Sequence, residues 1–470
     1  MQFHALMRFA VHLLALSAGL ASIGAAAPSD PLATLAAANG HPAALHFHAT
    51  GQRVVEGRTV TTSFDQLGQT RLIRRCIAGV CGGAWFDGSR EWTFGLNEVA
   101  LPEAVDARTL DLRTLSAIAS YAFAEPAFRA AGGTVAPAGP NRWRVRARDG
   151  VDLVAVTDAA GRSVVRVETP DGEPVAGYGR PAAAGGAAFA LERTGPLESG
   201  PLDTVAVAAG PLGPPPGPLP SFGAAATLRL AAATVPIVPC SLGGHAWRCL
   251  LDSGATPSAV DLHVAEALNL EPRGELELSG FTAFATGFIE SGPLDLGGAR
   301  FAQARFAVVP PSAAAAFDVV VGSDLLGRLR IVLDRRKGTA QIAPPGPPEP
   351  TAVPLMFRAG SPFVPLQLGA QAVRALLDTG DDATVSLGYA QYREGPQWPV
   401  VSRGEAAGMA GEEDAFLVAI PDVRIGPVAL GATRAVVRRT QAGPHVGVGL
   451  WAHAVIELDE QAERITFTGR

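Results

Sequence analysis

Short apolar runs, separated by glycine- and proline-rich turns, follow one another along most of the chain. In the N-terminal part, residues 47–64 and 141–172 form runs broken by Gly turns, a pattern typical of antiparallel strands. Residues 106–128 and 257–270 are predicted to be helical. Further short strands are predicted at 235–242, 247–252, 304–310, 317–322, 330–334 and 340–343. The pattern therefore predicts a mainly β protein with few helices.

Two proline-rich stretches divide this pattern. Residues 210–220 and 343–350 cannot continue a helix or a central strand, and they are typical of semi-rigid linkers. They separate an N-terminal domain at 28–210 from two further domains at 225–342 and 351–470. The first domain is expected to be a curved antiparallel sheet with a helix, and to carry no catalytic side chains.

The second and third domains are copies of one unit. Residues 238–254, VPCSLGGHAWRCLLDSG, match residues 364–380, VPLQLGAQAVRALLDTG. Near the domain ends, residues 321–334 match residues 446–459 at nearly the same offset. Two matches at nearly one offset indicate an internal duplication.

Composition and charge exclude some classes of function. Of the 470 residues, 48% are hydrophobic and 17% are charged, which is ample for several packed cores. The formal net charge of −6 argues against nucleic acid as a partner.

The first residues resemble a secretory signal. Arg8 precedes an apolar run from Phe9 to Ala27 that ends in small residues, so residues 1–27 are predicted to be cleaved. The alternative is an uncleaved membrane anchor. No other segment is long and apolar enough to cross a bilayer, so the mature protein is expected to be exported, periplasmic or secreted, without stable membrane insertion.

Four cysteines fit an oxidising compartment. They form two close pairs, Cys76 with Cys81 and Cys240 with Cys249, which predicts two disulfides. A zinc site is the alternative, but neither pair has the CxxC spacing of zinc ligands, and no metal is predicted.

The Cys240–Cys249 pairing has support from hairpin geometry. A turn at 244–245 would place the two cysteines opposite each other on neighbouring strands. The corresponding positions of the second copy are Leu366 and Ala375, both apolar, as expected for an inward-facing contact.

In each copy an apolar strand is followed by an Asp, Asp252 in the first copy and Asp378 in the second. An Asp in a tight turn often only caps backbone N–H groups. Here the tripeptide occurs twice, each time after Leu-Leu and at the same place in a duplicated unit, which indicates a functional pair. Two carboxylates held close together cannot both ionise easily, so they share a proton and can act as general base and general acid.

The neighbouring residues suit such a pair. Gly254 and Gly380 permit tight backbone turns, and the hydroxyls of Ser253 and Thr379 can lock the two loops by hydrogen bonds.

These motifs resemble the retroviral-type, or retropepsin-like, aspartic proteases. The resemblance rests on LLDSGAT at 250–256 and VVVG at 319–322, and more weakly on LLDTGDDATV at 376–385 and HVGVG at 445–449. Asp381 departs from the family pattern, which has a small residue there, and places a third carboxylate beside the pair.

The resemblance covers about the C-terminal half of the chain and implies a fold and an activity. The two copies would be retropepsin-like β-barrels that pair as an intramolecular pseudo-dimer in a monomeric protein. A water activated between Asp252 and Asp378 would hydrolyse a peptide or protein substrate without a cofactor.

The resemblance also implies hairpin flaps over the site. The candidates are residues 278–290, with Phe281 and Phe284, and residues 403–418, with Met409. The alternative for both is an ordinary exposed hairpin.

The N-terminal domain contains fewer residues that indicate a function. Around residues 85–92 its pattern weakly resembles the half-barrel domains of bacterial lipoprotein carriers. His46 and His48 would lie on one side of a strand, where they could bind a metal, but no further ligands support a metal site and simple exposure is the better interpretation. A different function therefore stays open, a non-catalytic lipid- or peptide-binding protein with a decayed protease-like pair. In a third hypothesis each copy pairs with another chain.

Overall fold

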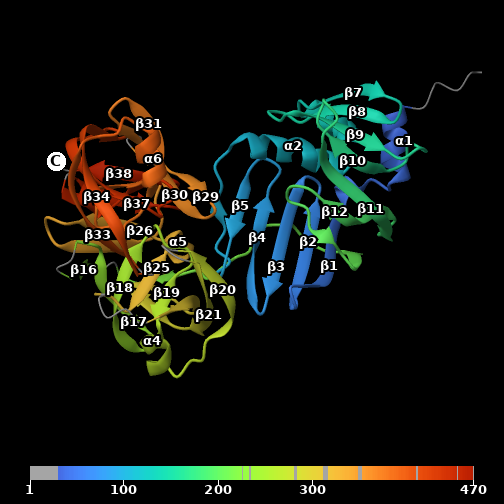
Figure 1. Ribbon diagram of the computed structural model, residues 1–470. Coiled ribbons are helices and arrows are strands. Elements are labelled where there is room, and N and C mark those ends of the chain that lie inside the picture. The colour runs from blue at the N-terminus through green and yellow to red at the C-terminus, as the bar shows by residue number, and fades with distance from the viewer. Residues whose placement is uncertain are drawn as a thin grey trace, which may run out of the picture.

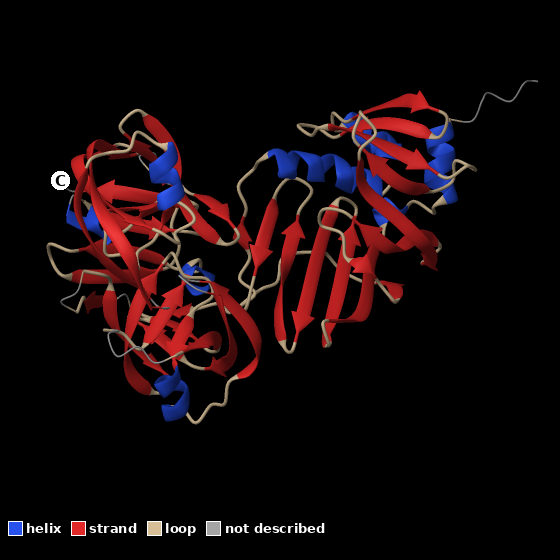
Figure 2. Ribbon diagram, viewed as in Figure 1, coloured by secondary structure: helices blue, strands red, loops and turns tan. Residues whose placement is uncertain are grey.

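Strands dominate the computed structural model (Figures 1 and 2). It describes residues 30–224, 226–231, 234–279, 283–310, 316–347, 352–408, 411–452 and 454–468. The predicted signal at 1–27 and the flap candidates Phe281 and Met409 lie outside the described residues. The prediction of a mainly β protein is confirmed. No helix among the described residues is long and apolar enough to cross a membrane.

The N-terminal part contains two antiparallel sheets of seven strands each, where one curved sheet was predicted. The first has the order β14 (Thr204–Val207), β1 (His46–Val55), β2 (Arg58–Leu67), β3 (Thr70–Ile77), β4 (Val80–Phe86), β5 (Glu91–Phe94) and β6 (Leu101–Pro102). The second has the order β13 (Gly200–Pro201), β12 (Ala187–Thr194), β11 (Pro174–Ala184), β10 (Val164–Glu168), β9 (Asp152–Thr157), β8 (Arg142–Arg146) and β7 (Thr134–Gly139).

Helices close the core of this part. They are α1 (Pro31–Ala38), η1 (Pro42–Ala44), α2 (Ala107–Ala119), η2 (Ala122–Ala124) and α3 (Pro126–Ala130). The helix predicted at 106–128 is thus broken after α2. Leu112 and Leu115 of α2 are fully buried in one cluster with Phe47, Phe64 and Phe189 of the sheets, so the two sheets and the helix share a core.

The first copy forms a ten-stranded sheet. Its order is β15 (Ser221–Phe222), β23 (Ala299–Phe301), β22 (Leu294–Leu296), β17 (Ile237–Leu242), β18 (His245–Asp252), β25 (Val319–Gly322), β19 (Ala259–Asp261), β24 (Ala304–Val309), β21 (Ala283–Ser291) and β20 (Arg273–Ser279). Two helices, α4 (Leu262–Ala267) and α5 (Ser323–Leu326), belong to the same copy.

The second copy forms an eight-stranded sheet on a matching plan. Its order is β29 (Met356–Arg358), β30 (Ser361–Leu368), β31 (Gln371–Leu377), β36 (His445–Val446), β32 (Val385–Gly388), β35 (Val428–Arg438), β34 (Gly411–Ile425) and β33 (Val400–Gly408). The helices α6 (Tyr389–Glu394) and η3 (Val448–Ala452) complete it. In both copies the strand that leads to the Asp runs parallel to a short later strand, β25 or β36.

The helix predicted at 257–270 is wrong in its first part. Residues Ala259–Asp261 form β19, which pairs with β24 and β25 and buries Val260 completely. Sheet pairing overrides the helical spacing here because it satisfies the backbone and buries a β-branched side chain. The helix begins only after Asp261, whose carboxylate accepts a hydrogen bond from the backbone N–H of His263.

A six-stranded sheet joins the two copies. Its order is β16 (Thr227–Arg229), β27 (Thr339–Ala343), β26 (Arg330–Asp334), β37 (Val455–Asp459), β38 (Arg464–Thr468) and β28 (Val353–Pro354). The equivalent strands β26 and β37 pair antiparallel at its centre, with Ile331 opposite Leu458 and Leu333 opposite Ile456. The core continues from one copy into the other, because these residues lie in one buried cluster.

The proline-rich stretches are anchored rather than free. The Arg328 side chain donates to the carbonyl of Pro216 at 2.8 Å in the first stretch. In the second, the N–H of Gly346 donates to the Asp459 carboxylate at 2.8 Å. The domain boundaries at 210, 225, 342 and 351 stay predictions.

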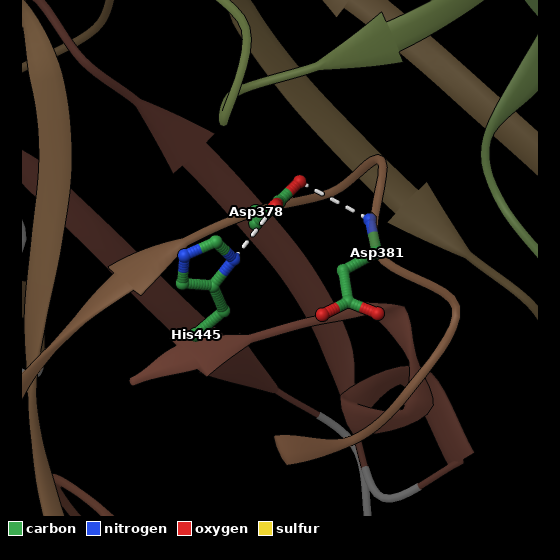
Figure 3. A group of neighbouring side chains, drawn as sticks. All are labelled: Asp378, Asp381 and His445. Carbon is green, nitrogen blue, oxygen red and sulfur yellow. Dashed lines mark hydrogen bonds and ion pairs between the residues drawn. The ribbon is translucent and has the colours of Figure 1, made fainter. Parts of the chain in front are cut away.

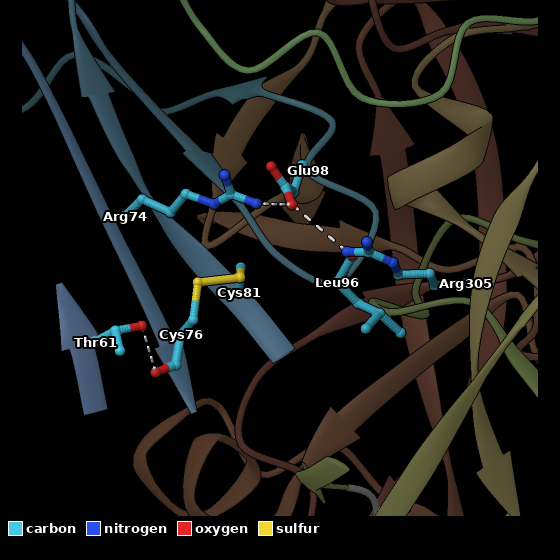
Figure 4. Close-up of a disulfide and its surroundings, with 7 residues drawn as sticks. All are labelled: Thr61, Arg74, Cys76, Cys81, Leu96, Glu98 and Arg305. Carbon is cyan, nitrogen blue, oxygen red and sulfur yellow. Dashed lines mark hydrogen bonds and ion pairs between the residues drawn. A yellow bond between two sulfur atoms is a disulfide. The ribbon is translucent and has the colours of Figure 1, made fainter. Parts of the chain in front are cut away.

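The N-terminal part contacts the copies through Val99 and Leu101, which lie in their buried cluster, and contacts the first copy through polar groups as well. Glu98 accepts from Arg74 at 2.5 Å and from Arg305 of β24 at 3.5 Å, beside the Cys76–Cys81 disulfide (Figure 4). Nearby, the Asn97 amide donates to the buried carboxylate of Asp324 at 2.7 Å. These bonds fix the N-terminal part to the ten-stranded sheet.

Both predicted disulfides are present, but the hairpin register behind the second differs from the prediction. The turn of β17–β18 is at 243–244, two glycines with positive φ, so Cys240 lies opposite Trp247 and Val238 opposite Cys249. The disulfide is therefore a diagonal cross-strand pair with a Cα–Cα distance of 5.8 Å. Its equivalents Leu366 and Ala375 are both buried, as expected.

Candidate active site

Asp252 and Asp378 meet at the junction of the two copies. Asp252 ends β18, and Asp378 directly follows β31. The two carboxyl groups are close neighbours, because each lies against the glycine of the opposite loop. The backbone N–H of Gly254 donates to Asp252 at 2.9 Å, and that of Gly380 donates to Asp378 at 3.0 Å. The two loops thus present their carboxyl groups in matching ways.

Hydroxyl groups lock the two loops together reciprocally. Thr379 Oγ1 accepts from the backbone N–H of Ser253 at 2.9 Å and donates to the carbonyl of Leu251 at 2.7 Å. Ser253 Oγ accepts from the backbone N–H of Thr379 at 3.2 Å and donates to the carbonyl of Leu377 at 2.6 Å. Both hydroxyl residues are buried, so the four bonds fix the position of the Asp pair.

The two glycines are required by close approach. A Cβ on Gly254 would lie 2.5 Å from the carboxyl carbon of Asp378, and a Cβ on Gly380 would lie 2.5 Å from that of Asp252. Each loop therefore needs glycine to let the opposite carboxyl group come near.

The two carboxyl groups differ in protonation. Burial raises the pKa of Asp252 well above its usual range, and the neighbouring Asp378 charge raises it further. Burial also raises the pKa of Asp378, but His445, through its hydrogen bond and its charge, together with Asp252 and the Gly380 N–H, outweighs burial and lowers this pKa overall. The pair therefore holds one proton over a wide pH range.

His445 contacts Asp378, which was not predicted from the sequence. Its Nδ1 lies 3.1 Å from Asp378 Oδ2 (Figure 3). The repeat alignment holds a signal for it, since extending the match of 321–334 with 446–459 by one residue sets His445 against Val320.

Asp381 does not act as a third carboxylate of the pair. Its backbone N–H donates to Asp378 at 3.1 Å, whereas its side chain points away from Asp378 (Figure 3). The carboxylate accepts from Ser386 Oγ at 2.5 Å and from Arg438 at 3.2 Å. The Asp381 charge is thus paired with the partly buried Arg438 guanidinium.

Asp378, Asp381 and His445 also have ligand atoms within 4.8 Å of one another, a spacing that suits a metal. Both Asp381 oxygens already accept hydrogen bonds, and one of them contacts the Arg438 guanidinium, which repels a cation. The donor set fits an ion-pair network better than a metal site.

A cleft of about 940 Å³ opens over the pair. Its lining includes Asp252 and Asp378, and residues of the second hairpin β33–β34, among them Arg403, Glu405 and Phe416. Both flap candidates are hairpins, as predicted. Of the described residues that line the cleft, none belongs to the first hairpin, where Phe284 is half-buried opposite Leu278.

The two histidines of the N-terminal part share one carboxylate. His48 Nδ1 lies 2.8 Å and His46 Nε2 lies 3.3 Å from the same oxygen of Asp65. Residues two apart in a strand share a face, so both histidines lie on one side of β1, where both contact Asp65.

Glu460 is a buried acid behind the two Asp loops. Burial raises its pKa well above the usual range. Ser323 Oγ lies 3.1 Å from its Oε1 and 2.8 Å from the carbonyl of Ser253. A serine hydroxyl has one proton, so a protonated Glu460 can donate to Ser323 while Ser323 donates to the loop.

Glu460→Gln is expected to flatten the dependence of stability on pH. Because the folded-state pKa is raised, the wild type keeps this stability below the unfolded pKa and loses it as pH rises, by up to about 1.4 kcal/mol per pH unit. The variant carries no such loss, so it should become the more stable protein toward neutral pH. Urea unfolding from pH 4 to pH 8 measures this, with the exposed Glu266→Gln as control. Parallel curves for wild type and Glu460→Gln would contradict the assignment.

Comparison with known proteins supports the resemblance to aspartic proteases. Residues 238–325 match the family model described as aspartyl protease, which confirms the resemblance of the first copy to aspartic proteases. A search of curated proteins found no match.

Solved structures with some similarity include three proteins. A retropepsin-like aspartic protease from Rickettsia conorii has 14% identity and a TM-score of 0.21, covering 24% of this chain and 96% of its own. Basic 7S globulin from soybean has 12% identity and a TM-score of 0.31, with coverage of 52% and 94%. Conglutin gamma from lupine seeds has 12% identity and a TM-score of 0.30, with coverage of 54% and 95%. At these TM-scores the similarities add nothing to the argument from the site.

Proposed function

We propose that this protein is an aspartic endopeptidase whose single site is shared by its two copies. The observation that carries the proposal is the close pairing of Asp252 and Asp378, each against the glycine of the opposite loop and held by reciprocal bonds of Ser253 and Thr379. The aspartyl protease match over residues 238–325 supports the reaction class.

The pair suits hydrolysis of a peptide bond by an activated water. The ionised carboxylate takes a proton from the water as its oxygen attacks the carbonyl carbon, and the protonated carboxyl group gives its proton to the carbonyl oxygen. The resulting diol collapses, the carbon–nitrogen bond breaks, and the amine nitrogen takes the proton that the first carboxylate holds. The diol returns a proton to the second carboxylate, so the pair ends as it began.

The rest of the chain fits an exported, self-contained enzyme. The shared β26–β37 sheet supports pairing of the copies within one chain, as an intramolecular pseudo-dimer. Two disulfides are typical of periplasmic or secreted proteins. The cleft is large enough for several residues of a peptide or protein substrate.

An assay on a mixed peptide library tests the proposal. The purified protein is expected to cleave internal peptide bonds at acidic to neutral pH, where the pair holds one proton. A transition-state inhibitor of aspartic proteases should stop cleavage, whereas serine- and metalloprotease inhibitors should not. Peptides that bind without cleavage at any pH would instead support the non-catalytic binding protein.

A further inference from the structure

We propose that His445 is a positioning residue that makes Asp378 the base and Asp252 the acid of the pair. The inference rests on the proposed function and adds to it a fixed direction of proton transfer. The two copies differ at the site in the 3.1 Å approach of His445 Nδ1 to Asp378 Oδ2.

The position of His445 in the fold shows how it breaks the symmetry. In the first copy β18 runs beside β25 with Leu250 opposite Val320, and in the second β31 runs beside β36 with Leu376 opposite His445. His445 therefore takes the place that Val320 holds in the first copy. A valine has no donor, so the contact offered to Asp378 has no equivalent from Val320 to Asp252.

Backbone N–H groups approach both carboxyl groups, those of Gly254 and Gly380 at Asp252 and those of Gly380 and Asp381 at Asp378, so His445 is the donor that distinguishes the two. Asp378 Oδ1 accepts from the N–H groups of both Gly380 and Asp381, at 3.0 and 3.1 Å. With His445 at Oδ2, both oxygens of Asp378 are engaged by donors that stabilise a negative charge. A proton shared by the pair is therefore better placed on Asp252.

The other charged groups around the pair do not replace His445. Arg438 contacts Asp381, and that pair is nearly neutral as a unit. Glu460 and Asp324 lie behind the loops, where burial raises the pKa of each and so favours their neutral forms. Asp382 lies exposed in the cleft, where water screens it.

The consequence is an assignment of each proton. Asp378 takes the proton of the attacking water and later passes it to the leaving amine. Asp252 gives its proton to the carbonyl oxygen and recovers one when the diol collapses.

Carboxyl ¹³C NMR titration tests this independently of cleavage. The full chain is labelled at the Asp carboxyl carbons, and the two resonances are assigned with Asp252→Asn and Asp378→Asn. In the wild type, Asp378 should titrate at lower pH than Asp252. In His445→Val, which introduces the residue of the first copy, Asp378 should titrate about one pH unit higher, a roughly tenfold tighter binding of its proton. The acid limb of the kcat/KM profile on a cleaved peptide should move the same way.

Two further variants complete the test. His445→Asn keeps an N–H donor near the position of Nδ1, so it should restore most of the wild-type titration, and it can be read even if His445→Val does not fold. His263→Val removes a histidine that pairs with Asp261 and Asp318, and it should leave the Asp378 titration unchanged.

The outcomes separate the two proposals. An Asp378 titration that is the same in wild type, His445→Val and His445→Asn would overturn the role of His445, even in an active peptidase. So would a wild type in which Asp252 titrates first. A wild type that cleaves no peptide would overturn the proposed function, while the titration would still decide where the proton lies.

Discussion

Replacing either Asp252 or Asp378 by Asn is expected to abolish peptide cleavage, with a loss of about 10²–10⁴-fold or more. Each carboxyl group acts as acid and base in one cycle, so neither can work without the other. For the same reason the double variant should lose no more than the single ones, because residues that act as a unit are not additive. The rate on a peptide identified in the library assay measures this.

Stability and a control distinguish lost chemistry from a lost fold. Asp252→Asn should keep or raise the free energy of unfolding, because it removes a buried carboxyl group that is costly to ionise. Asp422→Asn, at an exposed position of β34 that does not line the cleft, should retain cleavage. If Asp378→Asn cleaves like the wild type while Asp252→Asn is inactive, the copies do not share a site, and pairing with another chain becomes the better hypothesis.

Glu198→Gln is expected to destabilise the N-terminal part by about 3–5 kcal/mol. Glu198 accepts from Arg71 at 2.8 Å and from Arg193 at 2.6 Å, and the side chains of all three residues are at most 2% exposed. Burial raises the pKa of Glu198, but Arg193 and Arg71 outweigh it and lower this pKa overall. Its contribution is therefore present above the unfolded carboxyl pKa and is lost as pH falls through the lower folded pKa.

Unfolding of the full chain by urea at neutral pH, followed by far-UV circular dichroism, measures this loss. The N-terminal transition should move to lower urea in Glu198→Gln. Glu192→Gln, at an exposed site of β12, is the matched control and should change stability by less than about 0.5 kcal/mol. A similarly small change for Glu198→Gln would mean that the arginines find other partners.

Most residues of the candidate site could be predicted from the alignment of the two copies. Each copy has its Asp, hydroxyl residue and glycine at the same place, and the family resemblance implies that the two equivalent loops face each other. The structure brings Asp252, Asp378, Ser253 and Thr379 together. The catalytic role of these residues is a separate matter, and activity measurements decide it.

Side-chain direction and register depended on contacts that no local pattern contains. With the turn at 243–244, the pairing of the two strands differs by two residues from the predicted register, in which Cys240 lay opposite Cys249. Cys240 and Cys249 still lie on the same face of the hairpin, because side chains alternate along a strand. Residues 259–261 formed a strand because β24 and β25 lie on both sides of them. Asp381 turned toward Arg438, a cation 57 residues away in sequence.

The sequence by itself determined the mainly β class, the duplicated unit, the cysteine pairs and the two Asp loops, because turn residues, alternating apolar runs and repeated motifs are local. Only the tertiary structure decided how the two loops differ. His445 and Asp378 are 67 residues apart, and their contact exists because β36 lies beside β31. Burial and neighbouring charge set the protonation of a carboxyl group, and both are properties of the packed fold.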